Sequence, residues 1–134
     1  MRRIKLKFIM HEIDFLKEIE ILYYLIEQIC AIESFNAGFD EEMFLRNDLV
    51  KNASLMKLLV LGEYTTHIDD RLKSRFSEVE WQLIKKARNY YAHVYRGVDW
   101  LKVWETINKD IPALKIKMEG IIQSLEKENN AKTN

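Results

Sequence analysis

The chain is organised around residues 87–95, which read Ala-Arg-Asn-Tyr-Tyr-Ala-His-Val-Tyr. At about 100° per helical residue, Arg88 and Tyr95 share one face of a helix, while Asn89 and His93 share a neighbouring face. Histidine can move a proton near neutral pH, arginine presents a fork of donors to phosphate oxygens, and asparagine can hold a base, a sugar or water. The set suits metal-free attack of a ribose 2′-hydroxyl on the adjacent phosphorus. From spacing alone, however, a structural helix end with a capping histidine and a solvated arginine is the commoner arrangement.

The helix that carries this segment has a clear predicted beginning and end. Ser77 with Glu80 three residues later forms a capping box, and Phe76 with Trp81 occupies the two positions of a hydrophobic staple. The sequence therefore predicts that the helix begins at Ser77. Gly97 is typical of a left-handed C-cap, which would end the helix just after the motif.

The remaining chain is predicted to be helical throughout. Its 134 residues are 48% hydrophobic and contain only 4 Gly and 1 Pro, which indicates one all-α domain with few turns. The other predicted helices cover about 5–32, 40–47 (capped by Asp40), 48–72, 99–107 (capped by Asp99) and 112–125, with a kink near 108–111 caused by Pro112. We expect a single domain over residues 1–128 and a polar C-terminal tail over 129–134. Cys30, the only cysteine, follows an apolar stripe and is expected to be buried.

Gly62 and Glu63 stand out within the predicted helix 48–72. Glycine in a helix costs up to about 1 kcal/mol relative to alanine, so Gly62 indicates close approach of another helix. A buried, unpaired Glu63 would be costly, so we expect it to meet an arginine or tyrosine of the motif helix. A structural pairing is favoured over direct catalysis. His67 and Asp70 resemble metal ligands, but nothing in the sequence completes a metal site.

Charge is balanced overall but not along the chain. Lys plus Arg and Asp plus Glu both total 21, which excludes a global polycation. Residues 71–102 hold eight Lys and Arg against three acidic residues, which fits either a phosphate-binding cleft or a solvated, charged helix surface. The basic residues 1–7 are not followed by a continuous apolar stretch, so we expect no signal peptide, no membrane span and a cytoplasmic protein.

Several segments together resemble the HepT family, the HEPN-type toxins of HepT/MntA toxin-antitoxin pairs. They are Arg88-Asn89, His93-Val94-Tyr95, Gly97-Val98-Asp99, Val103-Trp104, Asp110-Ile111-Pro112-Ala113-Leu114, Leu61-Gly62-Glu63 and Glu80-Trp81. The similarity covers nearly the whole chain. The chain departs from the family at Glu80, where a proline usually precedes the tryptophan, and at Tyr90 and Tyr91, where smaller or aliphatic residues are commoner. The tyrosines bear on the shape of the cleft.

The resemblance implies a four-to-five-helix HEPN bundle that dimerises, with the Arg and His of both subunits facing one cleft. It further implies a metal-independent endoribonuclease without cofactors, neutralised by an MntA-like nucleotidyltransferase that transfers AMP to Tyr95. Arg88 and His93 would form the catalytic pair, which Asn89 assists. Glu63 and Tyr91 would support them.

Three functions remain open on these grounds. The first is an RNA-cleaving toxin, active as a homodimer or higher oligomer. The second is a catalytically silent HEPN module that partners a nucleotidyltransferase. In the third, a plain helical oligomer, the motif is a polar interface network. Independently of these functions, Tyr90 and Tyr91 are expected to be core or interface residues, with stacking on RNA bases as the less common alternative.

Overall fold

The computed structural model describes the backbone of residues 13–93 and 97–133, and the side chains of all of these except 90–93 and 133. All regular structure in this part of the chain is helical, which confirms the predicted all-α class. The elements in order are α2 (Phe15–Phe35), α3 (Glu41–Arg46), α4 (Asp48–Tyr64), the 3-10 turn η1 (Thr65–His67), α5 (Asp70–Arg75), α6 (Trp81–His93), α7 (Trp100–Glu105), the π-helical turn η2 (Thr106–Asp110) and α8 (Ile111–Thr133).

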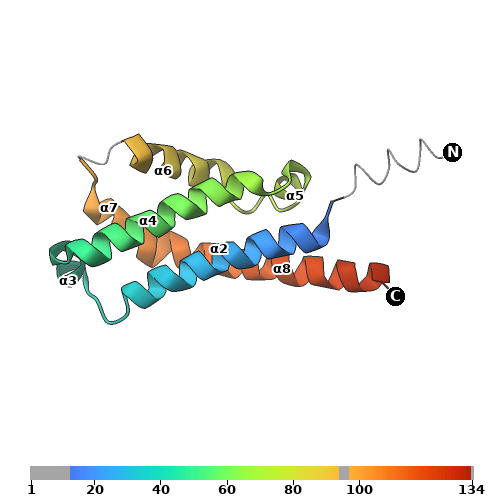
Figure 1. Ribbon diagram of the computed structural model, residues 1–134, viewed down its shortest axis with the longest axis horizontal. Helices are drawn as coiled ribbons and strands as arrows, with labels where there is room; N and C mark the ends of the chain where they lie inside the picture. The colour runs from blue at the N-terminus through green and yellow to red at the C-terminus, as the bar shows by residue number, and fades with distance from the viewer. Residues whose placement is uncertain (1–12, 94–96, 134) are drawn as a thin grey trace.

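The long helices pack as a bundle in which each has different neighbours. α2 lies between α4 and α8, and α4 in turn carries α6 on its other side (Figure 1). The fully buried side chains come mainly from α2 and α8, and include Leu22, Leu25, Ile29, Ile32, Met118, Ile121 and Leu125. α6 packs chiefly on α4 and η1, so it lies at the edge of the bundle.

Short polar side chains fix where most of these helices begin. The five capping residues are Asp14, Asn47 and Asp69, together with the predicted Asp40 and Asp99. Each accepts a hydrogen bond from a backbone N–H of the first turn, at 2.8 to 3.2 Å. The short helix that follows Asp40 ends at Arg46, as predicted.

The first predicted helix does not run continuously from residue 5. Asp14 is extended and caps α2, which begins at Phe15 and ends at Phe35. Residues 5–12, which include His11, lie outside the described part of the chain.

The predicted helix 48–72 is wrong in its second half. α4 ends at Tyr64 because Thr65 and Thr66 turn their hydroxyls back to carbonyl oxygens one turn earlier, at 2.8 and 2.6 Å, which competes with a continued helix. Asp69 then caps the separate helix α5.

The predicted start of the motif helix at Ser77 is also wrong. α6 begins at Trp81, and the carbonyl of Glu80 accepts the first helical bonds, from Leu83 and Ile84. Between α5 and α6 the chain turns so that Val79 is 2% exposed, and the indole N–H of Trp81 donates to the carbonyl of Phe76 at 3.1 Å. Burial of Val79 and this hydrogen bond favour a turn where the capping box predicted helix.

Cys30 is exposed, contrary to the prediction. The side of α2 that packs on α4 and α8 is centred near Leu25, which places Leu16 and Tyr23 on the surface, at 67% and 48% exposure. Residues three and four apart form more than one apolar stripe on α2. Periodicity alone therefore predicted the wrong side of the helix as buried at Cys30.

The C-terminal helix continues beyond the predicted end of the domain at residue 128. The kink predicted near 108–111 coincides with the π-helical turn η2, and Pro112 lies in the first turn of α8. α8 then extends to Thr133, anchored by an ion pair between Glu128 and Arg75 and by Lys132 over the ring of Phe15, 4.6 Å from its centroid.

Candidate active site

α6 approaches α4 closely where Arg88 crosses Gly62. A Cβ built on Gly62 would lie 2.1 Å from the Cβ of Arg88 and 2.8 Å from its Cγ, far inside contact distance. Only glycine therefore permits this crossing. The close approach predicted from Gly62 is confirmed, and its partner is the motif arginine.

The guanidinium of Arg88 is held by two oxygen atoms from different helices. Its Nη2 lies 2.5 Å from Oε2 of Glu63 on α4, and its Nη1 donates to Oδ1 of Asn89 at 2.7 Å. This confirms that Glu63 meets a motif-helix arginine. The Arg88 and Glu63 side chains remain 39% and 50% exposed, so part of the guanidinium fork stays open to solvent.

The other motif residues are placed only in part. His93 is the last residue of α6, one turn after Asn89, but its side chain and that of Tyr91 lie outside the described part. Tyr95 and its neighbours at 94–96 lie outside it entirely. The roles assigned to these three residues, and the Gly97 cap, stay predictions.

An aromatic row that the sequence did not predict lies next to Glu63. The ring of Tyr64 has its centroid 4.3 Å from that of Tyr24 on α2 and 5.2 Å from that of His67 on η1. Desolvation, and then Tyr64, raise the pKa of the Tyr24 phenol. Tyr64 and His67 are three residues apart, but Tyr24 lies on another helix, and no local pattern could have indicated its contact with Tyr64.

The described structure contains no cluster of metal-ligating side chains. Among the side chains that the structure describes, which do not include that of His93, no three from His, Cys, Asp or Glu come together in a way that could hold an ion. In the same part of the chain, no helix is both long enough and apolar enough to cross a lipid bilayer.

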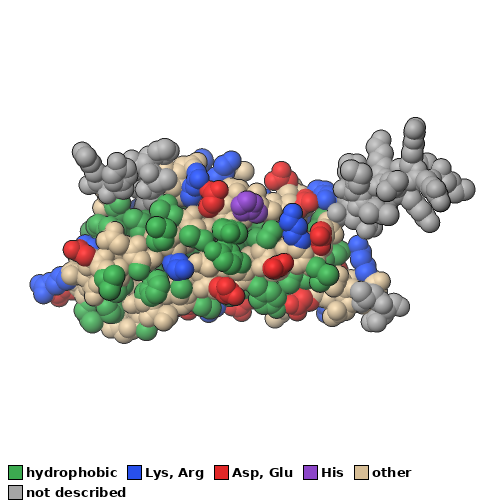
Figure 2. Space-filling view, viewed as in Figure 1, with side chains coloured by type: hydrophobic (Ala, Val, Ile, Leu, Met, Phe, Trp, Pro, Cys, Tyr) green, Lys and Arg blue, Asp and Glu red, His purple; other side chains and the backbone are tan. Residues whose placement is uncertain are grey.

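The basic side chains of segment 71–102 that the structure describes, a set without Arg96, do not line a single cleft. Three of its arginines are paired with acids on different elements: Arg71 with Asp69, Arg75 with Glu128 and Arg88 with Glu63. Lys85 and Lys86 are exposed on α6, and Figure 2 shows Lys and Arg side chains gathered over this helix at the upper edge of the molecule.

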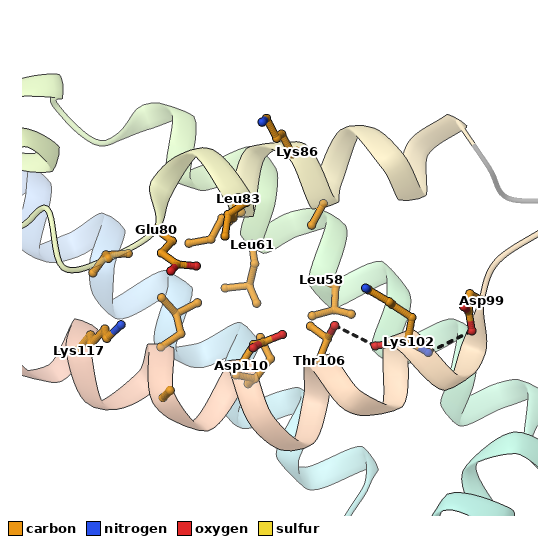
Figure 3. Close-up of a pocket in the computed structure, with 16 residues that line it drawn as sticks. Leu58, Leu61, Glu80, Leu83, Lys86, Asp99, Lys102, Thr106, Asp110 and Lys117 are labelled. Atoms are coloured by element: carbon orange, nitrogen blue, oxygen red, sulfur yellow. Dashed lines mark hydrogen bonds between the residues drawn. The ribbon is translucent and has the colours of Figure 1, made fainter.

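A groove of about 910 Å³ lies on another flank of α6, facing α7, η2 and the start of α8 (Figure 3). Its floor is apolar, with Leu58, Leu61 and Leu83 among its residues, and charged side chains such as Glu80 and Lys102 stand around it. Arg88 and Glu63 are not among its lining residues, so this groove is separate from the arginine site.

Comparison with known proteins identifies a family for the part of the chain that contains α4 and α6. Residues 25–121, which include Gly62, Glu63, Arg88 and His93, match the family model described as ribonuclease HepT-like. The chain is 32% identical to "Putative RNase MJ0125" of Methanocaldococcus jannaschii, over 78% of this chain and 90% of that protein. It is 33% identical to "Probable ribonuclease HepT" of Thermococcus cleftensis, over 71% and 86% respectively. No solved structure matches the chain significantly. The chain therefore belongs to the HepT-like ribonuclease family.

Proposed function

We propose that this chain is a metal-independent endoribonuclease whose catalytic groups lie on α6. The observation that carries the proposal is the placement of Arg88: Gly62 admits it, Glu63 and Asn89 orient it, and part of its fork remains exposed. An arginine held in this way can bind a phosphate in a fixed orientation. Membership of a ribonuclease family makes an RNA phosphodiester the natural substrate.

In the proposed reaction the ribose 2′-oxygen attacks the adjacent phosphorus. The bond from the 2′-oxygen to phosphorus forms, and the bond from phosphorus to the 5′-oxygen of the next nucleotide breaks. The proton of the 2′-hydroxyl passes to the 5′-oxygen with His93 as the carrier, which leaves a 2′,3′-cyclic phosphate and a 5′-hydroxyl. Arg88 stabilises the negative charge that develops on the phosphoryl oxygens, and Asn89 holds the guanidinium in place.

The proposal includes control by an MntA-like nucleotidyltransferase that transfers AMP to Tyr95, as in a toxin-antitoxin pair. Tyr95 follows the last residue of α6 by two positions. A bulky anion attached there would stand close to the phosphate site, where it would both obstruct and repel the RNA.

The proposed active form is a homodimer assembled through the face of α4 and α2 that Figure 2 presents, where hydrophobic side chains are abundant. On α4, Leu49 and Met56 are 80% and 59% exposed, and they precede Glu63 at intervals of seven residues, which places all three on one helix face. A second copy seated on this stripe would bring its own Arg88 and Glu63 to the same interface.

The test is cleavage of RNA in the presence of a chelator, after intact mass has shown that Tyr95 carries no AMP. Wild-type protein should produce 2′,3′-cyclic ends, and His93→Ala and Arg88→Ala should abolish them with helicity unchanged. His67→Ala is the matched control, since it removes an exposed histidine outside the motif. Light scattering should give twice the chain mass of 16.1 kDa.

Intact RNA after incubation with unmodified wild-type protein would refute the nuclease. The silent module that partners a nucleotidyltransferase would then take its place. Cleavage that survives in His93→Ala would instead refute the assigned residue.

A further inference from the structure

We infer that Lys85 and Lys86 form a phosphate-binding site for the RNA strand on the outward face of α6, next to the catalytic groups. This inference rests on the proposed ribonuclease function and extends it from the bond that is cut to the way the strand is held.

The register of α6 places both lysines beside the motif. Lys85 precedes Arg88 by three residues and Asn89 by four, while Lys86 precedes Asn89 by three and His93 by seven. Positions at these intervals share a helix surface. α6 packs chiefly on α4 and η1 at the edge of the bundle, and both lysines are exposed on it. Lys86 also lines the edge of the apolar groove, and Figure 3 shows its ammonium end directed away from the apolar residues.

The lysines also supply the positive charge that the arginine site lacks. Glu63 compensates the charge of Arg88, so the pair presents little net attraction to a distant phosphate. α6 contains no acidic residue between Trp81 and His93. Within the described part of the chain, neither Lys85 nor Lys86 has an ion-pair partner. Two exposed cations with no ion-pair partner and no acidic neighbour on α6 fit a polyanionic strand.

The spacing sets which phosphates these lysines would reach. Seven residues of α-helix separate Lys86 from His93 by about 10 Å along the axis. A stacked strand rises about 3.4 Å per nucleotide, so this distance corresponds to about three nucleotides. The lysines would therefore bind the strand about three phosphates from the scissile one and favour substrates long enough to span both places.

The experiment measures the salt dependence of binding to a single-stranded RNA oligonucleotide, in the His93→Ala background so that no cleavage occurs. The test variant is Lys85→Gln with Lys86→Gln. The matched control is Lys109→Gln with Lys127→Gln, which removes the same charge from exposed positions on η2 and α8. Lys85→Arg with Lys86→Arg keeps both positive charges, so this variant should bind RNA as the parent protein does.

We expect the test variant to lower the slope of log affinity against log salt by about 1.4, since each contact with a single strand contributes about 0.7. In the cleavage-competent background KM should rise about 10-fold while kcat changes less than 2-fold, a ratio that corresponds to about 1.4 kcal/mol. The control pair should match the parent protein in both assays.

Each outcome separates this inference from the proposed function. An unchanged slope, or a fall in kcat at constant KM, overturns the lysine site even if wild-type protein cleaves RNA. A reduced slope in a protein that never cleaves supports the lysine site and refutes the nuclease. Failure of the arginine variant to restore binding overturns the inference as well, because the role would then not be one of charge.

Discussion

Replacement of Gly62 by alanine tests the crossing on which the candidate site depends. The new Cβ would lie 2.1 Å from the Cβ of Arg88. Since carbon atoms pack at about 3.5 Å, α6 must retreat from α4 by roughly 1.4 Å at this point. The contact atom is a Cβ close to the backbone and not the tip of a flexible side chain, so a change of rotamer cannot relieve it.

The magnitude follows from comparison with Gly120→Ala in α8, where a Cβ would meet nothing within 4 Å. Both changes gain about 1 kcal/mol of helix propensity. Only Gly62→Ala adds overpacking, which costs about 1–3 kcal/mol. The gain in helix propensity cancels when the free energies of unfolding of the two variants are subtracted. Gly62→Ala should therefore be less stable than Gly120→Ala by about 1–3 kcal/mol. At this chain length that equals about 4 °C in Tm for each kcal/mol.

Urea unfolding of both variants measures this difference, and RNA cleavage measures its effect on the site. Displacement of a catalytic group by 1 Å can cost about 100-fold in rate, so Gly62→Ala should lose about that much kcat while Gly120→Ala keeps it. Equal stability of the two variants, together with full activity of Gly62→Ala, would refute the close crossing.

Two further predictions concern α2. Burial raises the pKa of the Glu18 carboxyl above its ordinary 4.5, although the backbone N–H of Asp69 donates a hydrogen bond to it. The folded state therefore binds this proton more tightly than the unfolded state does. The resulting stabilisation of the fold is complete below pH 4.5 and is lost as pH rises through the folded-state pKa. The glutamine of Glu18→Gln stays neutral, so this variant should become more stable than wild type as pH rises from 4.5 to neutrality. Urea titrations at several pH values measure the difference in free energy of unfolding between the two proteins, and a difference that does not change with pH would contradict this. Cys30, being exposed, should react with a thiol reagent in the native protein at one equivalent per chain, and Cys30→Ser should change the free energy of unfolding by less than about 0.5 kcal/mol; a thiol that reacts only in denaturant would contradict its exposure.

The features that sequence predicted well are those with a local cause. Asp40 and Asp99 cap helices because their carboxylates reach backbone N–H groups three residues on, a relation contained in a few consecutive residues. Gly62 and Glu63 were also identified, because a glycine and an acid inside an apolar helix are costly unless another helix meets them. The pattern could not identify Arg88 alone as the partner, since the motif offered tyrosines as well.

The early end of α4 has a local cause in Thr65 and Thr66, but the other failures have a tertiary cause. The capping box at Ser77 is locally sound, yet burial of Val79 and the bond from Trp81 to Phe76 move the helix start to residue 81. Cys30 lies on an apolar stripe of α2, but α4 and α8 cover a different side of that helix. The row formed by Tyr24, Tyr64 and His67 is complete only once α2 packs on α4, so its tertiary contact could not be found before the fold.

The packing of α2 against α8 has a consequence for synthesis on the ribosome. The apolar side of α2 is covered by a helix that is made much later, after α4 and α6. Contacts between segments so far apart in the chain are slow to form, because a long loop must close before burial repays it. Until α8 emerges, the nascent chain therefore holds Leu22, Leu25 and Ile29 without their final cover. The bundle that supports α6 is complete only when residues 111–133 pack against α2. Assembly of the domain, and any RNA cleavage it performs, therefore follows translation of α8.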